Sequence, residues 1–181
     1  MATISAVERR HREVLAKLGQ LATQVAELPE QIAVVVESEP VRRFYFNPEQ
    51  RAVKVGQEFL VEVRVDTLGA MADGAQAVVT FDPAYLSVVK VVPGIMFELV
   101  IYNQLDTEAG KFSFAAGVPF EQKEGLMDDG TLVTLRCKAL AATPGTTLAF
   151  VGPPAALRTK LAYQGVEVPA ETMSTLVVVI G

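Results

Sequence analysis

The 181-residue chain contains one cysteine, one histidine and no tryptophan. A single cysteine excludes an internal disulfide and any zinc site built from several thiolates. A single histidine excludes most metal centres and acid–base arrangements that depend on imidazole groups. No apolar run reaches the roughly 18 residues that a membrane-spanning helix needs. The composition thus predicts a protein without a membrane span, a metal site or a disulfide framework.

Positive charge is also scarce, with 16 Lys and Arg residues against 21 Asp and Glu residues and a net charge of -5. Proteins that bind nucleic acids neutralise phosphates with clustered Lys and Arg side chains. The longest basic cluster here, residues 9–12, includes His11 and is flanked by Glu8 and Glu13. We therefore expect no nucleic-acid partner.

The same charged residues lie where a signal peptide would have its uncharged core. They predict a chain that is made in the cytoplasm without a signal peptide. The alternative is an extracellular protein whose signal peptide has been removed.

Motifs of catalysis are missing as well. The sequence has no G-x-S-x-G, H-E-x-x-H or P-loop pattern and no glycine-rich dinucleotide loop. A carboxylate pair could hydrolyse glycosides, but Asp128 and Asp129 are adjacent and would point to opposite faces of a strand. The following Gly130 favours a turn at this point. We predict a non-enzyme with no catalytic residues, no cofactor and no bound metal.

Aromatic side chains argue against a sugar-binding surface. Flat cellulose-binding faces use aligned aromatic residues, especially tryptophan. The four tyrosines are spread over different segments, at Tyr45, Tyr85, Tyr102 and Tyr163. Carbohydrate binding is therefore not expected.

The N-terminal segment has a helical pattern. Its apolar residues are spaced by alternating steps of three and four, Thr3 is a candidate N-cap, and Pro29 ends the pattern. This predicts a helix within residues 1–30, followed by a linker over 31–42. The heptad a and d positions are Ile4, Val7, His11, Val14, Leu18, Leu21, Val25 and Leu28.

So narrow a stripe is typical of a coiled-coil seam. β-Branched residues at the d positions Val7 and Val14 disfavour a parallel dimer. We therefore predict that the helix is an oligomerising arm, and that among homo-oligomers of the chain a trimer is favoured first. The alternative is a helix that packs on its own domain.

From Ile32 onward the apolar residues alternate with a period of two, and turn residues separate the runs. The clearest runs are 43–48, 52–68, 75–83, 86–94, 97–103, 110–117, 129–141, 145–152 and 174–181. Many short strands without helices between them predict a mainly β, antiparallel, two-sheet sandwich over 43–181. The expected core is Phe59, Val61, Val63, Val65, Ala77, Val79, Phe81, Phe112, Phe114, Val133, Leu135 and Cys137.

Four segments in order resemble strands of a cohesin module, the β-sandwich receptor of cellulosome scaffolds. The most specific part is Phe81-Asp82-Pro83, followed by Leu86 and then by Val-Val-Pro-Gly at 91–94. The resemblance spans about residues 43–181. It implies a jelly-roll-like sandwich of nine strands, related in fold to some carbohydrate-binding modules. The segments are VKVGQEFLVEVRVDTL, GAQAVVTFDPAYLSVVKVVPG, AGKFSFAAG and DGTLVTLRCKALAATPGTTLAF.

The resemblance also implies a partner face, on one sheet built from the strands at about 75–81, 98–103, 111–116 and 146–151. The side chains opposite the core on these strands are small, and few of them are charged. An ordinary solvated face would carry more Lys, Glu and Arg. We predict a contact with a partner or another subunit here, and the alternative is that loops or the helix cover the face. The residues are Gln76, Val78, Thr80, Lys111, Ser113, Ala115, Thr147, Ala149 and Val151.

These features predict a non-catalytic structural or assembly module that binds proteins through the sandwich and oligomerises through its helix. Sandwich-plus-arm subunits of this kind occur in larger particles such as phage virions, as capsid decoration or fibre proteins. The alternative is a cohesin receptor that binds a dockerin-type helical partner in a polysaccharide-degrading complex.

Overall fold

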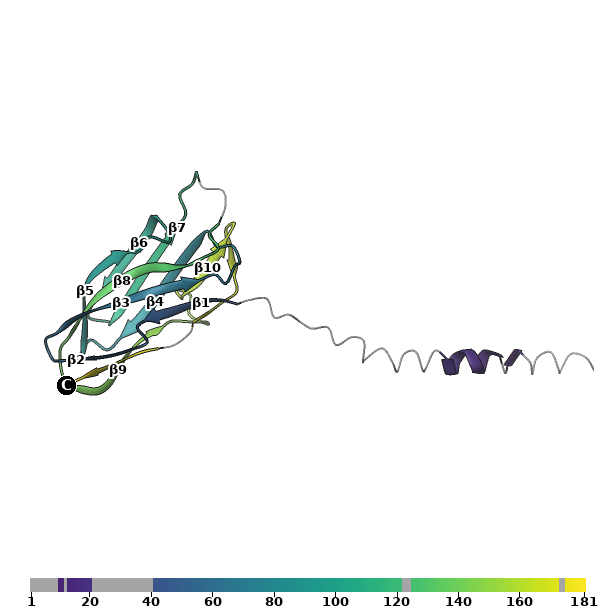
Figure 1. The fold of residues 1–181 in the computed structure, drawn as a ribbon, viewed down its shortest axis with the longest axis horizontal. Coiled ribbons are helices and arrows are strands. Elements are labelled where there is room, and N and C mark those ends of the chain that lie inside the picture. The colour runs from purple at the N-terminus through teal and green to yellow at the C-terminus, as the bar shows by residue number, and fades with distance from the viewer. Residues whose placement is uncertain (1–9, 12, 21–40, 122–124, 173–174) are drawn as a thin grey trace, which may run out of the picture. The chain divides into compact units, whose positions relative to one another are not determined.

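The computed structural model describes residues 10–11, 13–20, 41–121, 125–172 and 175–181. The chain divides into two compact units, residues 1–39 and residues 40–181. In the first unit, residues 10–11 and 13–20 are helical and exposed (Figure 1). The predicted linker lies outside the described residues as far as residue 40. So do the other predicted heptad positions, which are Ile4, Val7, Leu21, Val25 and Leu28.

No described helix is both long enough and apolar enough to cross a bilayer.

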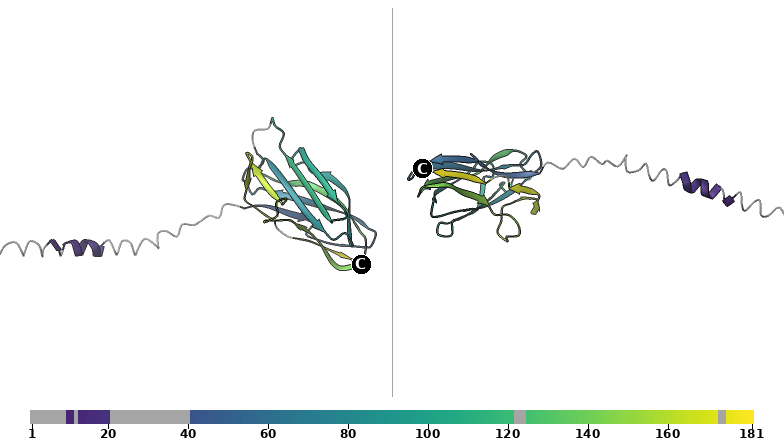
Figure 2. Two further views of the ribbon diagram at one scale, coloured as in Figure 1. Left: turned by 180° about the vertical axis from the view of Figure 1, so that it is seen from behind. Right: turned by 90° about the horizontal axis from the view of Figure 1, so that it is seen from below.

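The second unit is a two-sheet β-sandwich (Figures 1 and 2). One sheet has the strand order β12-β1-β3-β8-β5, and the other has β11-β10-β4-β9-β13-β2 with β7 and β6 beyond β4. The strands are β1 (Arg42–Asn47), β2 (Gln50–Val53), β3 (Glu58–Asp66), β4 (Gly74–Phe81), β5 (Leu86–Pro93), β6 (Leu99–Asp106), β7 (Lys111–Gly117), β8 (Asp129–Ala139), β9 (Thr143–Phe150), β10 (Lys160–Tyr163), β11 (Val166–Val168), β12 (Ala170–Thr172) and β13 (Leu176–Ile180).

The nine predicted runs all contain strands, but the described residues of the sandwich form thirteen strands rather than nine. The run 52–68 is broken between β2 and β3 by a turn in which Gln57 N–H donates to the Lys54 carbonyl at 3.0 Å. Gly56 allows this turn because its φ is +82°. The strands β10, β11 and β12 were missed because three or four residues are too few to show a period of two.

Period-two alternation predicts the core correctly. All twelve residues expected inside the sandwich are buried. The inner faces of the two sheets also meet through Phe46 of β1 and Phe150 of β9, whose rings stack with centroids 4.2 Å apart. Full burial of each large apolar side chain stabilises the fold by about 1.5–3 kcal/mol. Cys137 is a buried hydrophobic residue, and burial raises the pKa of its thiol to about 12.

Candidate partner-binding face

The four strands of the predicted partner face lie in one sheet, in the order β6-β7-β4-β9. β4 pairs with β7 from Gly74–Gly117 to Thr80–Lys111, and β6 pairs with the other side of β7. β9 joins the opposite edge of β4, where Thr80 faces Ala149. Segments far apart in sequence therefore form one continuous surface, which we call the β6-β7-β4-β9 face.

The nine predicted residues differ in accessibility. Thr80 and Thr147 are exposed, whereas Val78 and Ser113 are buried. These two residues are not available to a partner, which corrects the sequence prediction. The other five are partly exposed: Gln76, Lys111, Ala115, Ala149 and Val151.

The segment between β9 and β10, residues 151–159, accounts for this burial. The Thr159 hydroxyl bonds both the N–H and the carbonyl of Val78 at 3.0 Å, and Val151 N–H donates to the same carbonyl at 2.8 Å. The Gln76 amide donates to the Arg158 carbonyl at 2.7 Å. Leu157 shares a hollow with Gln104, Asp106, Lys111 and Ser113. The alternative in which a loop covers the face thus applies to its middle.

Sequence reasoning missed apolar residues that belong to this face. Ile101 lies at a bulge in β6, between the pairs Val100–Ala116 and Tyr102–Ala115, and its side chain is 68% exposed. A Cβ added at Gly117 would lie 3.5 Å from Ile101, so Ile101 lies above the end of β7. Leu157 was also missed because it belongs to a loop. A bulge interrupts the alternation that would have assigned Ile101 to a face.

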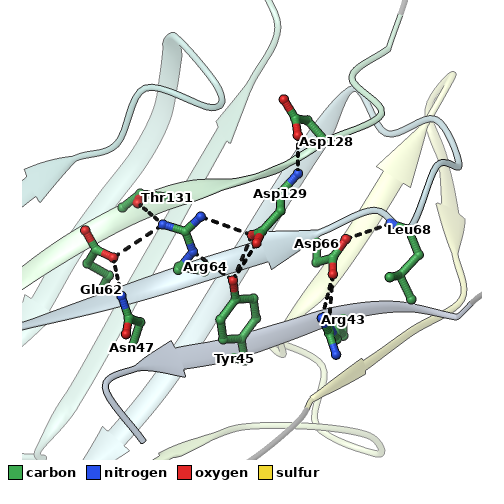
Figure 3. Close-up of polar contacts among 10 residues, drawn as sticks. All are labelled: Arg43, Tyr45, Asn47, Glu62, Arg64, Asp66, Leu68, Asp128, Asp129 and Thr131. Carbon is green, nitrogen blue, oxygen red and sulfur yellow. Dashed lines mark hydrogen bonds and ion pairs between the residues drawn. The ribbon is translucent and has the colours of Figure 1, made fainter.

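The outer face of the other sheet is highly charged (Figure 3). The Tyr45 hydroxyl donates to the Asp129 carboxylate at 2.8 Å, and Arg64 Nε donates to the Tyr45 oxygen at 2.8 Å. Arg64 also forms an ion pair with Asp129 at 3.2 Å, and Arg43 forms one with Asp66 at 2.7 Å. Asp129 is therefore a paired residue at the start of β8, and the turn predicted at 128–130 is wrong at this residue.

This network shifts the pKa of two groups. Partial burial raises the pKa of Tyr45 above its ordinary value, and the hydrogen bond to Asp129 is the second-largest cause of this rise. The hydrogen bond to Tyr45 raises the pKa of Arg64. The protonated forms of both side chains are thus favoured in the folded chain.

We expect one tyrosine to titrate above pH 10 in the folded chain, and this component to disappear in a Tyr45→Phe variant. A raised pKa contributes stability that is complete below about pH 10 and is lost as the pH rises through the folded-state pKa. Phenolate absorbance, recorded against pH for both proteins, measures this. Loss from the variant of a component other than the one with the raised pKa would show that Tyr45 is not the shifted group.

The two outer faces differ in their charge. Four ion pairs join charges on the β1-β3-β8 face, including Arg64–Glu62 at 3.4 Å and Arg136–Glu58 at 3.7 Å. Such pairs suit a solvated surface. The β6-β7-β4-β9 face has small, mostly uncharged side chains, and interface cores are depleted in charge. It is the better candidate for a partner-binding surface.

Another hollow, of about 400 Å³, is lined by Arg158, Lys160 and Glu167 among others, and Arg158 is already paired with Glu167 at 2.8 Å. Across the part of the chain that the structure describes, no three His, Cys, Asp or Glu side chains gather as metal ligands.

Comparison with known families decides the classification. The family model of the cohesin domain matches residues 47–154. The chain belongs to the cohesin domain family. This cohesin domain is a non-catalytic module for protein–protein interaction. No curated protein matches the chain by sequence.

Solved cohesins share the fold. The third cohesin of ScaC from Acetivibrio cellulolyticus, solved with the ScaB dockerin, is 14% identical, with a TM-score of 0.65 over 77% of this chain and 99% of that one. A type II cohesin from the same organism is 16% identical, with a TM-score of 0.59 over 77% and 94%. A non-cellulosomal cohesin from Archaeoglobus fulgidus is 12% identical, with a TM-score of 0.61 over 78% and 91%.

Proposed function

We propose that this cohesin domain is a receptor for a dockerin-type helical module, which binds on the β6-β7-β4-β9 face. The observation that carries the proposal is the contrast between this nearly uncharged face and the ion-paired opposite face. The likeness to cohesins solved in complex with dockerins supports it. The same likeness favours a receptor over a subunit of a phage particle.

The residues that contact the partner in this proposal are the accessible ones. Thr80, Thr147 and Ala149 supply the β4–β9 half of the face, and Ala115 lies on β7 between Gln76 of β4 and Tyr102 of β6. Leu157 shares a hollow with Gln104 of β6 and Lys111 of β7, on the other half of the face. Polysaccharide degradation is not part of the proposal, because a non-cellulosomal cohesin has the same fold.

The N-terminal helix is proposed as a self-association arm. Val14 and Leu18 occupy successive d and a positions, and their side chains are 53% and 57% exposed. An apolar stripe of this kind is stabilised when copies of the helix pack together. A receptor carried on such an arm would present several dockerin sites at once, which increases avidity.

Titration calorimetry of the full chain with the dockerin modules encoded in the same genome tests the receptor proposal. We expect saturable binding of one dockerin to each chain by at least one module. Absence of binding by every module, with a folded chain, would contradict the proposal.

A further inference from the structure

One long strand edge of the sandwich is open. β6 pairs only with β7, and in the described ranges no main-chain group of β6 bonds outside that ladder. Unpaired N–H and carbonyl groups along an edge can pair with another strand. After its bulge, β6 has a regular stretch at residues 102–106, which is close to the usual length of a strand.

The other edge strands have features that discourage such pairing. β5 contains Lys90, a register shift between Val88 and Lys90, and Pro93 at its end. β2 has four residues, and β11 and β12 have three each. Lysine, proline, bulges and shortness all blunt a strand edge. β6 contains neither lysine nor proline, and its only charged residue is Asp106 at the end. Its bulge lies before Tyr102, so residues 102–106 form an uninterrupted stretch.

The composition of β6 suits pairing with itself. Residues 102–106 pair regularly with β7, because the bulge lies before Tyr102. In an antiparallel pair centred on Gln104, Tyr102 lies opposite Asp106 of the second copy, and Asn103 lies opposite Leu105. No like charges face each other in this register.

We propose that two copies of this chain associate through antiparallel β6–β6 pairing about a two-fold axis at Gln104. The contact is isologous, so it closes as a dimer and leaves no further open β6 edge. It joins two sheets into one and leaves the outer face of each accessible. The inference goes beyond the proposed receptor function, and its test contains no dockerin.

The decisive variant is Gln104→Cys in the full chain. Residues opposite each other in antiparallel strands have Cα atoms about 4.5–5.5 Å apart, within the range of a disulfide. The native Cys137 does not interfere, because it is buried and its thiol pKa is raised to about 12. The matched control is Lys90→Cys, which places an exposed thiol on β5, the edge strand of the other sheet.

With oxidised glutathione, we expect Gln104→Cys to form a covalent dimer at least about tenfold faster than Lys90→Cys. Equal rates would overturn the proposal, because random collision or the N-terminal helix would then account for the dimer. Denaturing electrophoresis without reductant measures both rates.

A second variant, Gln104→Lys, places two like charges opposite each other at the axis and should prevent pairing. Sedimentation velocity compares it with wild type and with Leu18→Asp, which disrupts association through the helix. We expect Gln104→Lys to lower the average mass in both the wild-type and the Leu18→Asp backgrounds. An unchanged mass distribution in both backgrounds would contradict β6 pairing.

Discussion

Replacing Gly94 by alanine is expected to destabilise the sandwich by roughly 3 kcal/mol or more. An added Cβ would lie 1.8 Å from the carbonyl oxygen of Thr131 and 2.5 Å from its carbonyl carbon. These atoms belong to the backbone of β8, so no side-chain rotation relieves the overlap. The Gly94 N–H also donates to the Leu132 carbonyl at 2.9 Å. This hydrogen bond would be strained if the added Cβ pushed the backbone at Gly94 away from β8.

Urea unfolding followed by circular dichroism measures this loss. Gly152→Ala is the matched control, because a Cβ at Gly152 meets no atom within 4 Å. We expect the control to change the free energy of unfolding by less than about 0.5 kcal/mol. A Gly94→Ala variant as stable as this control would show that the β5–β6 connection is placed incorrectly against β8.

Replacing Ala115 by arginine is expected to weaken dockerin binding by about 100-fold or more, which corresponds to about 2.7 kcal/mol. Ala115 lies between Gln76 and Tyr102, two residues along β7 from the buried Ser113, and is partly exposed. A long cationic side chain there prevents close approach and must lose water on binding.

The matched control is Leu60→Arg. Leu60 is 55% exposed on β3, in the opposite sheet. We expect this variant to bind dockerin as tightly as wild type, and both variants to unfold at the wild-type urea concentration. A stronger loss of affinity in Leu60→Arg than in Ala115→Arg would show that dockerin binds the β1-β3-β8 sheet instead of the proposed face.

The sandwich could be predicted from the sequence because burial depends on local side-chain direction. Val61, Val63 and Val65 alternate with Glu62 and Arg64, and a strand sends alternate residues to opposite faces. The long strands each contain enough residues to show this alternation. β10 to β12 do not, and their pairing depends on partners as distant as Gly74 and Arg42.

The candidate site could be predicted only in part, because its accessibility depends on long-range contacts. Val78 has the pattern of an outward residue on β4, yet it is buried, and its main chain bonds the Thr159 hydroxyl from 81 residues away. Asp129 resembles a turn residue until Tyr45, 84 residues distant, is placed beside it. No local pattern in the sequence encodes either contact.

Amide hydrogen exchange of the full chain, with and without a bound dockerin, tests whether this cohesin domain binds a dockerin on the β6-β7-β4-β9 face. We expect new protection in β4, β6, β7 and β9 and in residues 151–159, with exchange in β1, β3, β8 and β5 unchanged. Protection confined to β1, β3, β8 and β5 would contradict it.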